Sequence, residues 1–141
     1  MKLDFTERIP APPDRVFAAL TDPAMIQSCV DGLESMTPAG ANVYDVRARP
    51  GLKGRMTFLE SKPGESIALA VEGKSLAGSL KGELRVRLKP EGAGTRIEGS
   101  GDVTVGGFLA ALGPKMIETG GRKAVSDFFS KLSARLTSSA P

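Results

Sequence analysis

The sequence predicts an α+β fold: a curved antiparallel sheet of six to seven strands packed against a long C-terminal helix, with two short helices after the first strand. Three observations support this. Apolar and polar residues alternate near the N-terminus, turn signals recur over residues 33–105, and residues 108–136 have helical periodicity. A chain of 141 residues can bury a sufficient core without disulfides, so we expect a single domain over residues 1–141.

Two residue counts exclude whole classes of chemistry. The chain has no histidine, which excludes Ser-His-Asp and Cys-His catalysis, histidine-ligated metal sites and a histidine pH switch. Cys29 is the only cysteine, which excludes an internal disulfide and a multi-cysteine zinc site and favours a reducing cytoplasm. The formal charge of +3 is a weak indication of affinity for anionic surfaces.

The first expected strand covers residues 2–9. Leu3, Phe5 and Ile9 alternate with polar residues, which is typical of a half-buried strand. Glu7 falls on the apolar side, either as a buried acid of functional interest or at an exposed strand end. The N-terminus lacks the apolar core of a signal peptide, and no run of about 18 apolar residues predicts a membrane span.

Two short helices are expected before the main sheet. The stretch "PAPPDRVFAAL" ends the first strand, and its prolines are tolerated in the first turn of a helix. In "TDPAMIQSCV", Asp22 is a favourable N-cap and Pro23 a favourable first helical residue, so a second helix is expected there.

Residues 33–105 predict five or six strands of an antiparallel meander, because short loops separate them at regular intervals. The clearest alternation is "SLKGELRVRLK", whose charged residues face water. Glycines recur on the inward side, either to bend the sheet or to leave room for a bound molecule. The expected inward residues are Tyr44, Val46, Ala48, Met56, Phe58, Ile67, Leu69, Val71, Leu80, Leu84, Val86, Leu88, Ile97, Val103 and Val105, with Gly54, Gly73, Gly82, Gly99 and Gly101.

Residues 108–136 predict an amphipathic helix that contains glycines and a proline. Pro114 must kink this helix or begin a new one. Gly120 and Ala124 allow either close packing on the sheet or a gap that a ligand fills. Residues 137–141 are expected to fray. The buried stripe is expected at Leu109, Leu112, Met116, Gly120, Ala124, Phe128 and Leu132, flanked by Ile117, Gly121, Val125, Phe129 and Leu136.

Two further residues are candidates for chemistry, each with a structural alternative. Cys29 is either a reactive thiol or a small buried apolar residue. Tyr44 either donates its hydroxyl to a ligand carbonyl, such as a quinone oxygen, or packs in the core. No glycine-rich stretch has the order that binds phosphates, and the chain has one tyrosine and no tryptophan for base stacking. Neither nucleotide nor nucleic-acid binding is therefore expected.

The order of the elements resembles the helix-grip fold of the START-like (SRPBCC) superfamily, in which a curved sheet wraps the last helix around an apolar cavity. Within that superfamily, nearly the whole chain is similar to the CoxG family, which is named for carbon monoxide dehydrogenase. The matching stretches include "PAPPDRVFAALTDP", "GSLKGELRVRL", "GAGTRIEGSGDVTVGG" and "VGGFLAALGPKMIE", and Phe128 and Phe129 match a later aromatic pair.

The resemblance implies a bacterial, cytoplasmic accessory factor of a molybdenum hydroxylase, with no catalytic residues, no metal and no tightly bound cofactor. It implies a lipophilic ligand, a quinone or a lipid, and recruitment of the hydroxylase subunits to the inner face of the cell membrane. Longer members of the family carry an apolar C-terminal anchor, and none follows Leu136 here. We therefore expect reversible, peripheral membrane contact through Lys115, Arg122 and Lys123.

Three functions remain open from the sequence. The favoured one is a non-enzymatic carrier or recruiter whose cavity holds a lipophilic molecule. The others are an interaction module without a cavity and an enzyme of the polyketide cyclase type, which needs inward polar groups such as Tyr44 and Glu7. The cavity lining expected for the carrier consists of Phe5, Tyr44, Phe58, Leu84, Phe108, Leu112, Met116, Gly120, Ala124 and Phe128.

Overall fold

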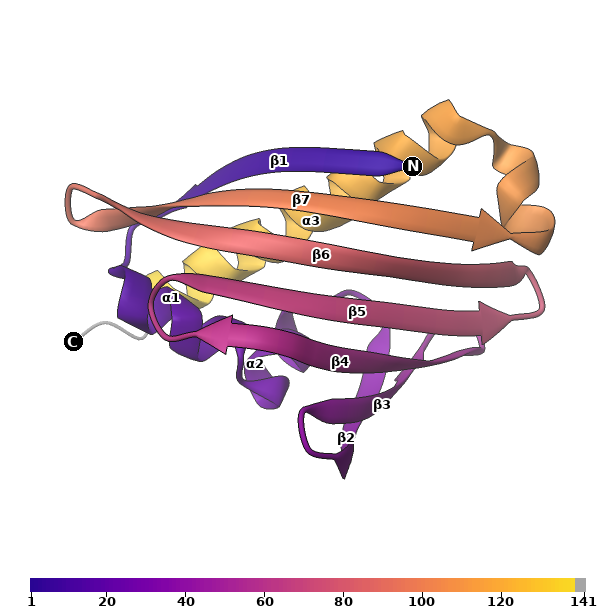
Figure 1. Ribbon diagram of the computed structural model, residues 1–141, viewed down its shortest axis with the longest axis horizontal. Helices are drawn as coiled ribbons and strands as arrows, with labels where there is room; N and C mark the ends of the chain where they lie inside the picture. The colour runs from indigo at the N-terminus through magenta and orange to yellow at the C-terminus, as the bar shows by residue number, and fades with distance from the viewer. Residues whose placement is uncertain (139–141) are drawn as a thin grey trace.

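A computed structural model describes residues 1–138 of the chain. In it, seven strands form one curved antiparallel sheet, and the helices lie on one side of it (Figure 1). The elements in chain order are β1 (Lys2–Ile9), α1 (Pro13–Leu20), α2 (Pro23–Cys29), β2 (Leu33–Gly40), β3 (Val43–Ala48), β4 (Leu52–Lys62), β5 (Ser66–Ser75), β6 (Gly78–Glu91), β7 (Gly94–Gly106), the 3-10 helix η1 (Gly107–Leu112) and α3 (Pro114–Ser138).

The strands are arranged in the order β1-β7-β6-β5-β4-β3-β2, and every neighbouring pair is antiparallel. Strands β2 to β7 are therefore a continuous meander, joined by short turns as the sequence predicts. The helices α1 and α2 connect β1 at one edge of the sheet to β2 at the other edge. The predicted fold, a helix-grip arrangement of seven strands, two short helices and a long C-terminal helix, is confirmed.

The start of α2 has the expected cap. The carboxylate of Asp22 accepts a hydrogen bond from the backbone N–H of Ala24 at 3.0 Å, and Pro23 is the first helical residue. An N-cap aspartate satisfies a backbone donor that has no partner inside the helix, and such a cap stabilises a helix by about 1 kcal/mol. This cap fixes where the chain turns toward the second edge of the sheet.

The core lies between α1, the end of α3 and the strands that face them. Ile97, Val16 and Leu132 have no exposed surface, and Ile9 is 2% exposed. Thr95 is also 2% exposed, and its hydroxyl donates a hydrogen bond to the carbonyl oxygen of Ala11 at 2.7 Å. The buried polar group is thereby satisfied, as a core requires.

The glycines on the inner face are explained in two places by close contacts within the sheet. A Cβ at Gly99 would overlap the ring of Phe5, and a Cβ at Gly54 would overlap the carbonyl oxygen of Glu72. Protein atoms, and not a ligand, therefore require glycine at these two positions. The expected inward side chains that are found in the core or packed against it are Tyr44, Val46, Met56, Phe58, Ile67, Leu69, Leu84, Val86, Leu88 and Ile97.

The C-terminal segment is two helices, as one of the two alternatives at Pro114 predicts. Gly113 separates them with a φ of 85°, and Pro114 begins α3. The expected fraying is wrong for Thr137 and Ser138, which continue α3, and the last three residues lie outside the described part of the chain.

The expected buried stripe of α3 is wrong in its first half. Met116 is 62% exposed, and Gly120 and Ala124 are also exposed, as is Leu112 in η1. The face turned to the protein includes Gly121, whose Cβ position lies 3.4 Å from the Leu3 side chain of β1. The main contacts of α3 are with β1, α2, η1 and α1, so its side facing away from β1 remains uncovered.

Candidate functional site

A groove of about 250 Å³ lies between α3 and the junction of α2 with β2. Two short segments from distant parts of the sequence form its walls. The lining residues are Cys29, Val30, Asp31, Gly120, Lys123, Ala124, Asp127 and Phe128.

The α3 wall of the groove is open because its residues are small. Gly120 and Ala124 are four residues apart and share one face of the helix. A Cβ added at Gly120 would have no heavy atom within 4 Å. At the end of this wall, the Phe128 ring contacts the Phe129 ring edge-on, with centroids 5.1 Å apart. The groove thus has an apolar end and an unfilled middle.

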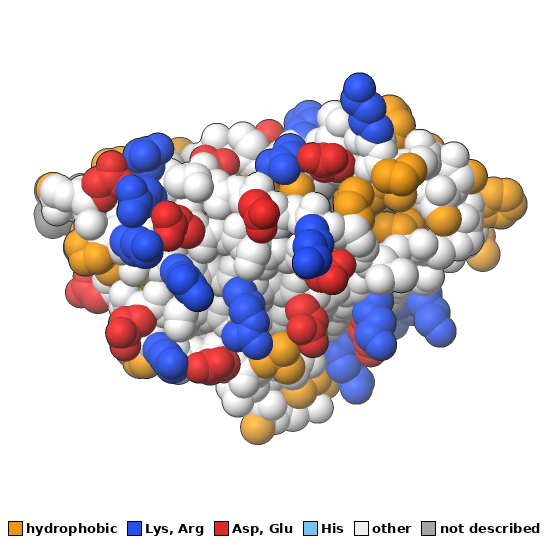
Figure 2. Space-filling view, turned by 45° about the horizontal axis from the view of Figure 1, so that its top comes forward, with side chains coloured by type: hydrophobic (Ala, Val, Ile, Leu, Met, Phe, Trp, Pro, Cys, Tyr) orange, Lys and Arg blue, Asp and Glu red, His pale blue; other side chains and the backbone are white. Residues whose placement is uncertain are grey.

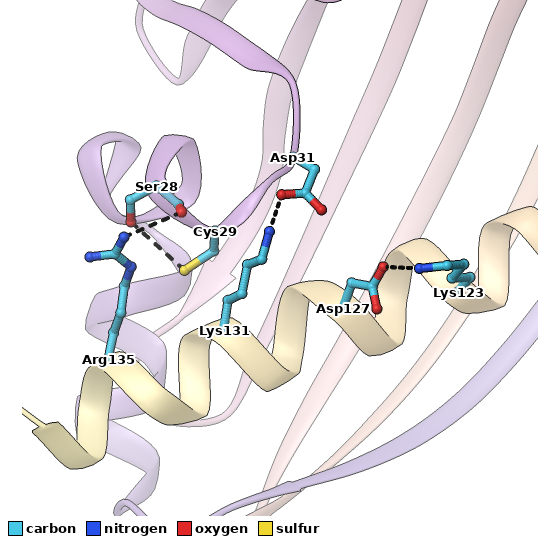
Figure 3. A network of polar contacts seen from close by, with 7 residues as sticks. All are labelled: Ser28, Cys29, Asp31, Lys123, Asp127, Lys131 and Arg135. Carbon is cyan, nitrogen blue, oxygen red and sulfur yellow. Dashed lines mark hydrogen bonds and ion pairs between the residues drawn. The ribbon is translucent and has the colours of Figure 1, made fainter.

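Two ion pairs border the groove, as Figure 3 shows. Lys131 of α3 donates a hydrogen bond to the carboxylate of Asp31, and Lys123 pairs with Asp127 at 2.6 Å along the helix. The hydrogen bond and positive charge of Lys131 lower the pKa of Asp31. The hydrogen bond and negative charge of Asp127 raise the pKa of Lys123. All four groups are charged near neutral pH, and their charges cancel.

A third contact holds α2 to α3 beside the groove. A guanidinium N–H of Arg135 donates to the carbonyl oxygen of Ser28 at 3.5 Å. The neighbouring Cys29 is 1% exposed, and its Sγ lies 3.8 Å from the Ser28 hydroxyl (Figure 3). Cys29 therefore packs as a small buried residue, which is one of its two interpretations from the sequence.

The inner faces of β3 to β6 carry apolar side chains that are only partly buried. They are only partly covered because α3 packs mainly along β1 and the other helices. The hydroxyl of Tyr44 has no hydrogen-bond partner among residues 1–138, and its ring meets the Phe58 ring edge-on with centroids 6.1 Å apart. The partly buried side chains of this inner surface include Tyr44, Val46, Met56, Leu69 and Leu84.

The residues expected to line one cavity lie in four places. Gly120, Ala124 and Phe128 lie together in the groove. Tyr44, Phe58 and Leu84 lie on the inner face of the sheet, and Phe5 packs between Gly99 and Phe129. Phe108, Leu112 and Met116 are exposed at the far end of the molecule, where they are 81%, 53% and 62% exposed.

A larger hollow of about 570 Å³ lies on the outer face of the sheet. Its lining mixes both charges, with Arg55, Lys81, Glu72, Glu83 and Asp102 around small and apolar residues. None of the residues expected to line a cavity borders it, and the helices lie on the opposite side of the sheet (Figure 1). The groove beside α3 is therefore the candidate site.

Two other kinds of site are absent from the described residues. Over residues 1–138, no three Cys, Asp or Glu side chains come together in an arrangement that could hold a metal ion. Within the same range, no helix combines the length and the apolar character needed to cross a bilayer.

The model of the carbon monoxide dehydrogenase family CoxG matches residues 6–137. The chain belongs to the CoxG family. The match includes both walls of the groove and every element of the fold except the first residues of β1 and the end of α3. No curated protein sequence matches the chain.

Solved structures show the same fold as this CoxG-family chain at low sequence identity. A conserved protein from Geobacillus kaustophilus has a TM-score of 0.95 at 22% identity, covering 99% of this chain and 97% of that one. Protein MLL2253 from Mesorhizobium loti has a TM-score of 0.74 at 20% identity, covering all of both chains. Ara h 8.0201 has a TM-score of 0.77 at 15% identity, covering 98% of each chain. These are START-like structures.

Sequence reasoning missed the charged border of the groove. Asp127 follows Lys123 by four residues, a spacing that pairs charges on a helix and was available as a signal. Asp31 and Lys131 are separated by 100 residues, and no local pattern connects them. Glu7, an inward acid in the sequence, is partly buried in β1 opposite Ile97 and forms no ion pair within the described residues.

Proposed function

We propose that this CoxG-family protein is a non-enzymatic accessory protein that binds a neutral lipophilic molecule between α3 and the inner face of the sheet. The observation that carries the proposal is the uncovered side of α3. It faces a groove with no side chain at Gly120, on the same side of the sheet as the partly buried residues of β3 to β6. Apolar surface left uncovered inside a fold favours an apolar ligand.

The size of the groove supports partial enclosure of the ligand. Pockets that enclose a drug-sized molecule measure about 300–1,000 Å³, and the groove measures about 250 Å³. It therefore suits one end of a long lipophile, such as a ring with its carbonyl groups. The remaining apolar part of the ligand would lie on the inner face near Met56, Leu69 and Leu84.

The charges at the groove support a neutral ligand over an anionic one. Lys123 is paired with Asp127, and Lys131 is paired with Asp31, so neither lysine is left to bind a carboxylate. A quinone carbonyl needs only a hydrogen-bond donor, and Lys123 and the Tyr44 hydroxyl are donors on this side of the sheet. A quinone is therefore the ligand that we propose first, and a neutral lipid second.

Family membership supports the accessory role. The family name associates these proteins with carbon monoxide dehydrogenase, and we propose that the partner of this chain is a molybdenum hydroxylase. The ligand would then be an electron acceptor, and the protein would bring acceptor and enzyme together at the membrane. A function as a cyclase has less support, because the groove charges are already paired with one another.

Titration calorimetry with coenzyme Q1, a short-chain quinone, tests the proposal. We expect one molecule to bind per chain, and we expect Ala124→Leu to weaken binding at least about tenfold by filling the groove. Ala134→Leu is the matched control, because Ala134 is exposed on α3 but does not border the groove. No binding to the unaltered protein contradicts the function, and equal binding by all three proteins contradicts the location.

A further inference from the structure

One end of the molecule carries a cluster of exposed apolar side chains. Leu76, at the turn between β5 and β6, is fully exposed at 102%, and Phe108 of η1 is 81% exposed. Leu112 and Met116 continue the cluster onto the start of α3. Figure 2 shows hydrophobic side chains gathered at this end, whereas the rest of the same face is covered by mixed charges. We call these four residues the apolar tip.

The apolar tip is held in place by backbone contacts. The N–H of Leu109 in η1 donates to the carbonyl oxygen of Ala77 at 2.9 Å, which joins η1 to the β5–β6 turn. A Cβ at Gly107 would lie 2.8 Å from the Cα of Gly78, too close for a side chain. The two glycines thus let the turn and η1 pack directly against each other. The exposed leucine and phenylalanine are therefore presented from one surface.

The charges next to the apolar tip are all positive. Over residues 73–79 and 105–117, the only charged side chains are Lys74 and Lys115. Lys53 adds a third, because it stands opposite Lys74 in the β4–β5 ladder. Among the described residues, none of these three lysines forms an ion pair. The tip is therefore apolar at its centre and cationic at its border.

We propose that the apolar tip inserts into the surface of a bilayer that contains anionic lipids. Single side chains that protrude from a turn can enter the headgroup region while nearby lysines bind lipid phosphates. A flat protein partner is less suited to this surface, because protein interfaces centre on side chains enclosed in pockets. Leu76 and Phe108 instead project into solvent. The occupant is thus an anionic membrane surface.

The tip also leads to the groove. Leu112, Met116, Gly120 and Ala124 follow one another at four-residue steps, and all four are exposed. This stripe continues from the apolar tip along α3 to the groove wall. Resting on the proposed function, we infer that a lipophile from the bilayer reaches the groove along this stripe.

Vesicle co-sedimentation tests the membrane contact. We expect the protein to sediment with vesicles of phosphatidylcholine and phosphatidylglycerol. The double variant Leu76→Ser/Phe108→Ser is expected to lose at least about tenfold in partitioning. Lys74→Gln/Lys115→Gln is expected to lose the preference for phosphatidylglycerol over phosphatidylcholine alone. Leu59→Ser is the matched control, because Leu59 is 50% exposed on β4 outside the tip. Circular dichroism confirms that each variant is folded.

Each outcome decides the proposal. Failure of the unaltered protein to sediment overturns it, and so does equal sedimentation of the Leu76→Ser/Phe108→Ser variant. A concentration-dependent dimer that this double variant abolishes would assign the tip to a second copy of the chain, and would also overturn it. Coenzyme Q1 binding in solution separates the two proposals. The tip variant should retain it, and Ala124→Leu should lose it while still sedimenting with vesicles.

Discussion

The ring of Phe5 in β1 packs against the ring of Phe129 in α3, with centroids 5.8 Å apart and planes inclined by 41°. Phe5 stands directly opposite Gly99 in the β1–β7 ladder, and its ring occupies the space where a Gly99 side chain would be. One aromatic side chain therefore sets the spacing between two strands and the last helix. It holds α3 close to β1, away from the middle of the sheet.

The variant Gly99→Ala should lower the free energy of unfolding by about 1–3 kcal/mol, because its methyl group would overlap the Phe5 ring. Urea denaturation measures this loss. The double variant Phe5→Leu/Gly99→Ala should recover part of it, since the smaller side chain leaves room for the methyl group. A Gly99→Ala protein as stable as the original would contradict the placement of the Phe5 ring.

The variant Gly120→Ala should raise the free energy of unfolding by about 1 kcal/mol, because it replaces glycine inside a helix and meets no atom within 4 Å. Thermal and urea denaturation report this gain. The neighbouring Gly121 provides the contrast, since its Cβ position contacts Leu3. Gly121→Leu should therefore destabilise by about 1–3 kcal/mol, whereas Gly120→Leu should not. Equal losses at both positions would show that Gly120 is covered.

The sequence predicts the sheet better than the last helix, for a physical reason. In a strand, alternation has only two phases, so an inward residue such as Leu84 identifies the whole inner face. In α3, large and small apolar residues cover more than half of the helix, and several rotations bury a similar amount of surface. The contact of Gly121 with Leu3 selects the rotation, and that contact depends on β1.

The groove was predictable only in part. Gly120 and Ala124 attract attention because small residues interrupt an apolar stripe, and both lie in the groove wall. The opposite wall comes from the end of α2, and its distance from α3 follows from the way β1, α1 and α2 connect the two edges of the sheet. No pattern of residues near Asp31 contains that information.

The pKa of Asp31 should lie below the usual aspartate value of about 3.9, because Lys131 donates a hydrogen bond to it and adds positive charge, and Lys123 adds more. Since the folded-state pKa is the lower one, the stabilisation by this pair is present above that usual value. It is lost as the pH falls through the folded-state pKa.

Carboxyl NMR titration tests this prediction directly. In the Lys131→Met variant, the pKa of Asp31 should rise toward its usual value. Glu98 is the control, because its lowered pKa depends first on Lys89, on a different part of the surface. An Asp31 titration that is the same in both proteins would show that the ion pair with Lys131 does not form in solution.

The thiol of Cys29 should resist alkylation in the folded protein, because the residue is only 1% exposed although it borders the groove. Maleimide labelling followed by mass spectrometry should show slow reaction in buffer and rapid reaction in urea, where unfolding exposes the thiol. The next residue gives a matched control, since Val30 is 37% exposed. A Val30→Cys substitution in a Cys29→Ala background should be labelled quickly in the folded protein. Rapid labelling of Cys29 itself would mean that α2 separates from α3 in solution, and that the groove opens further than the structure shows.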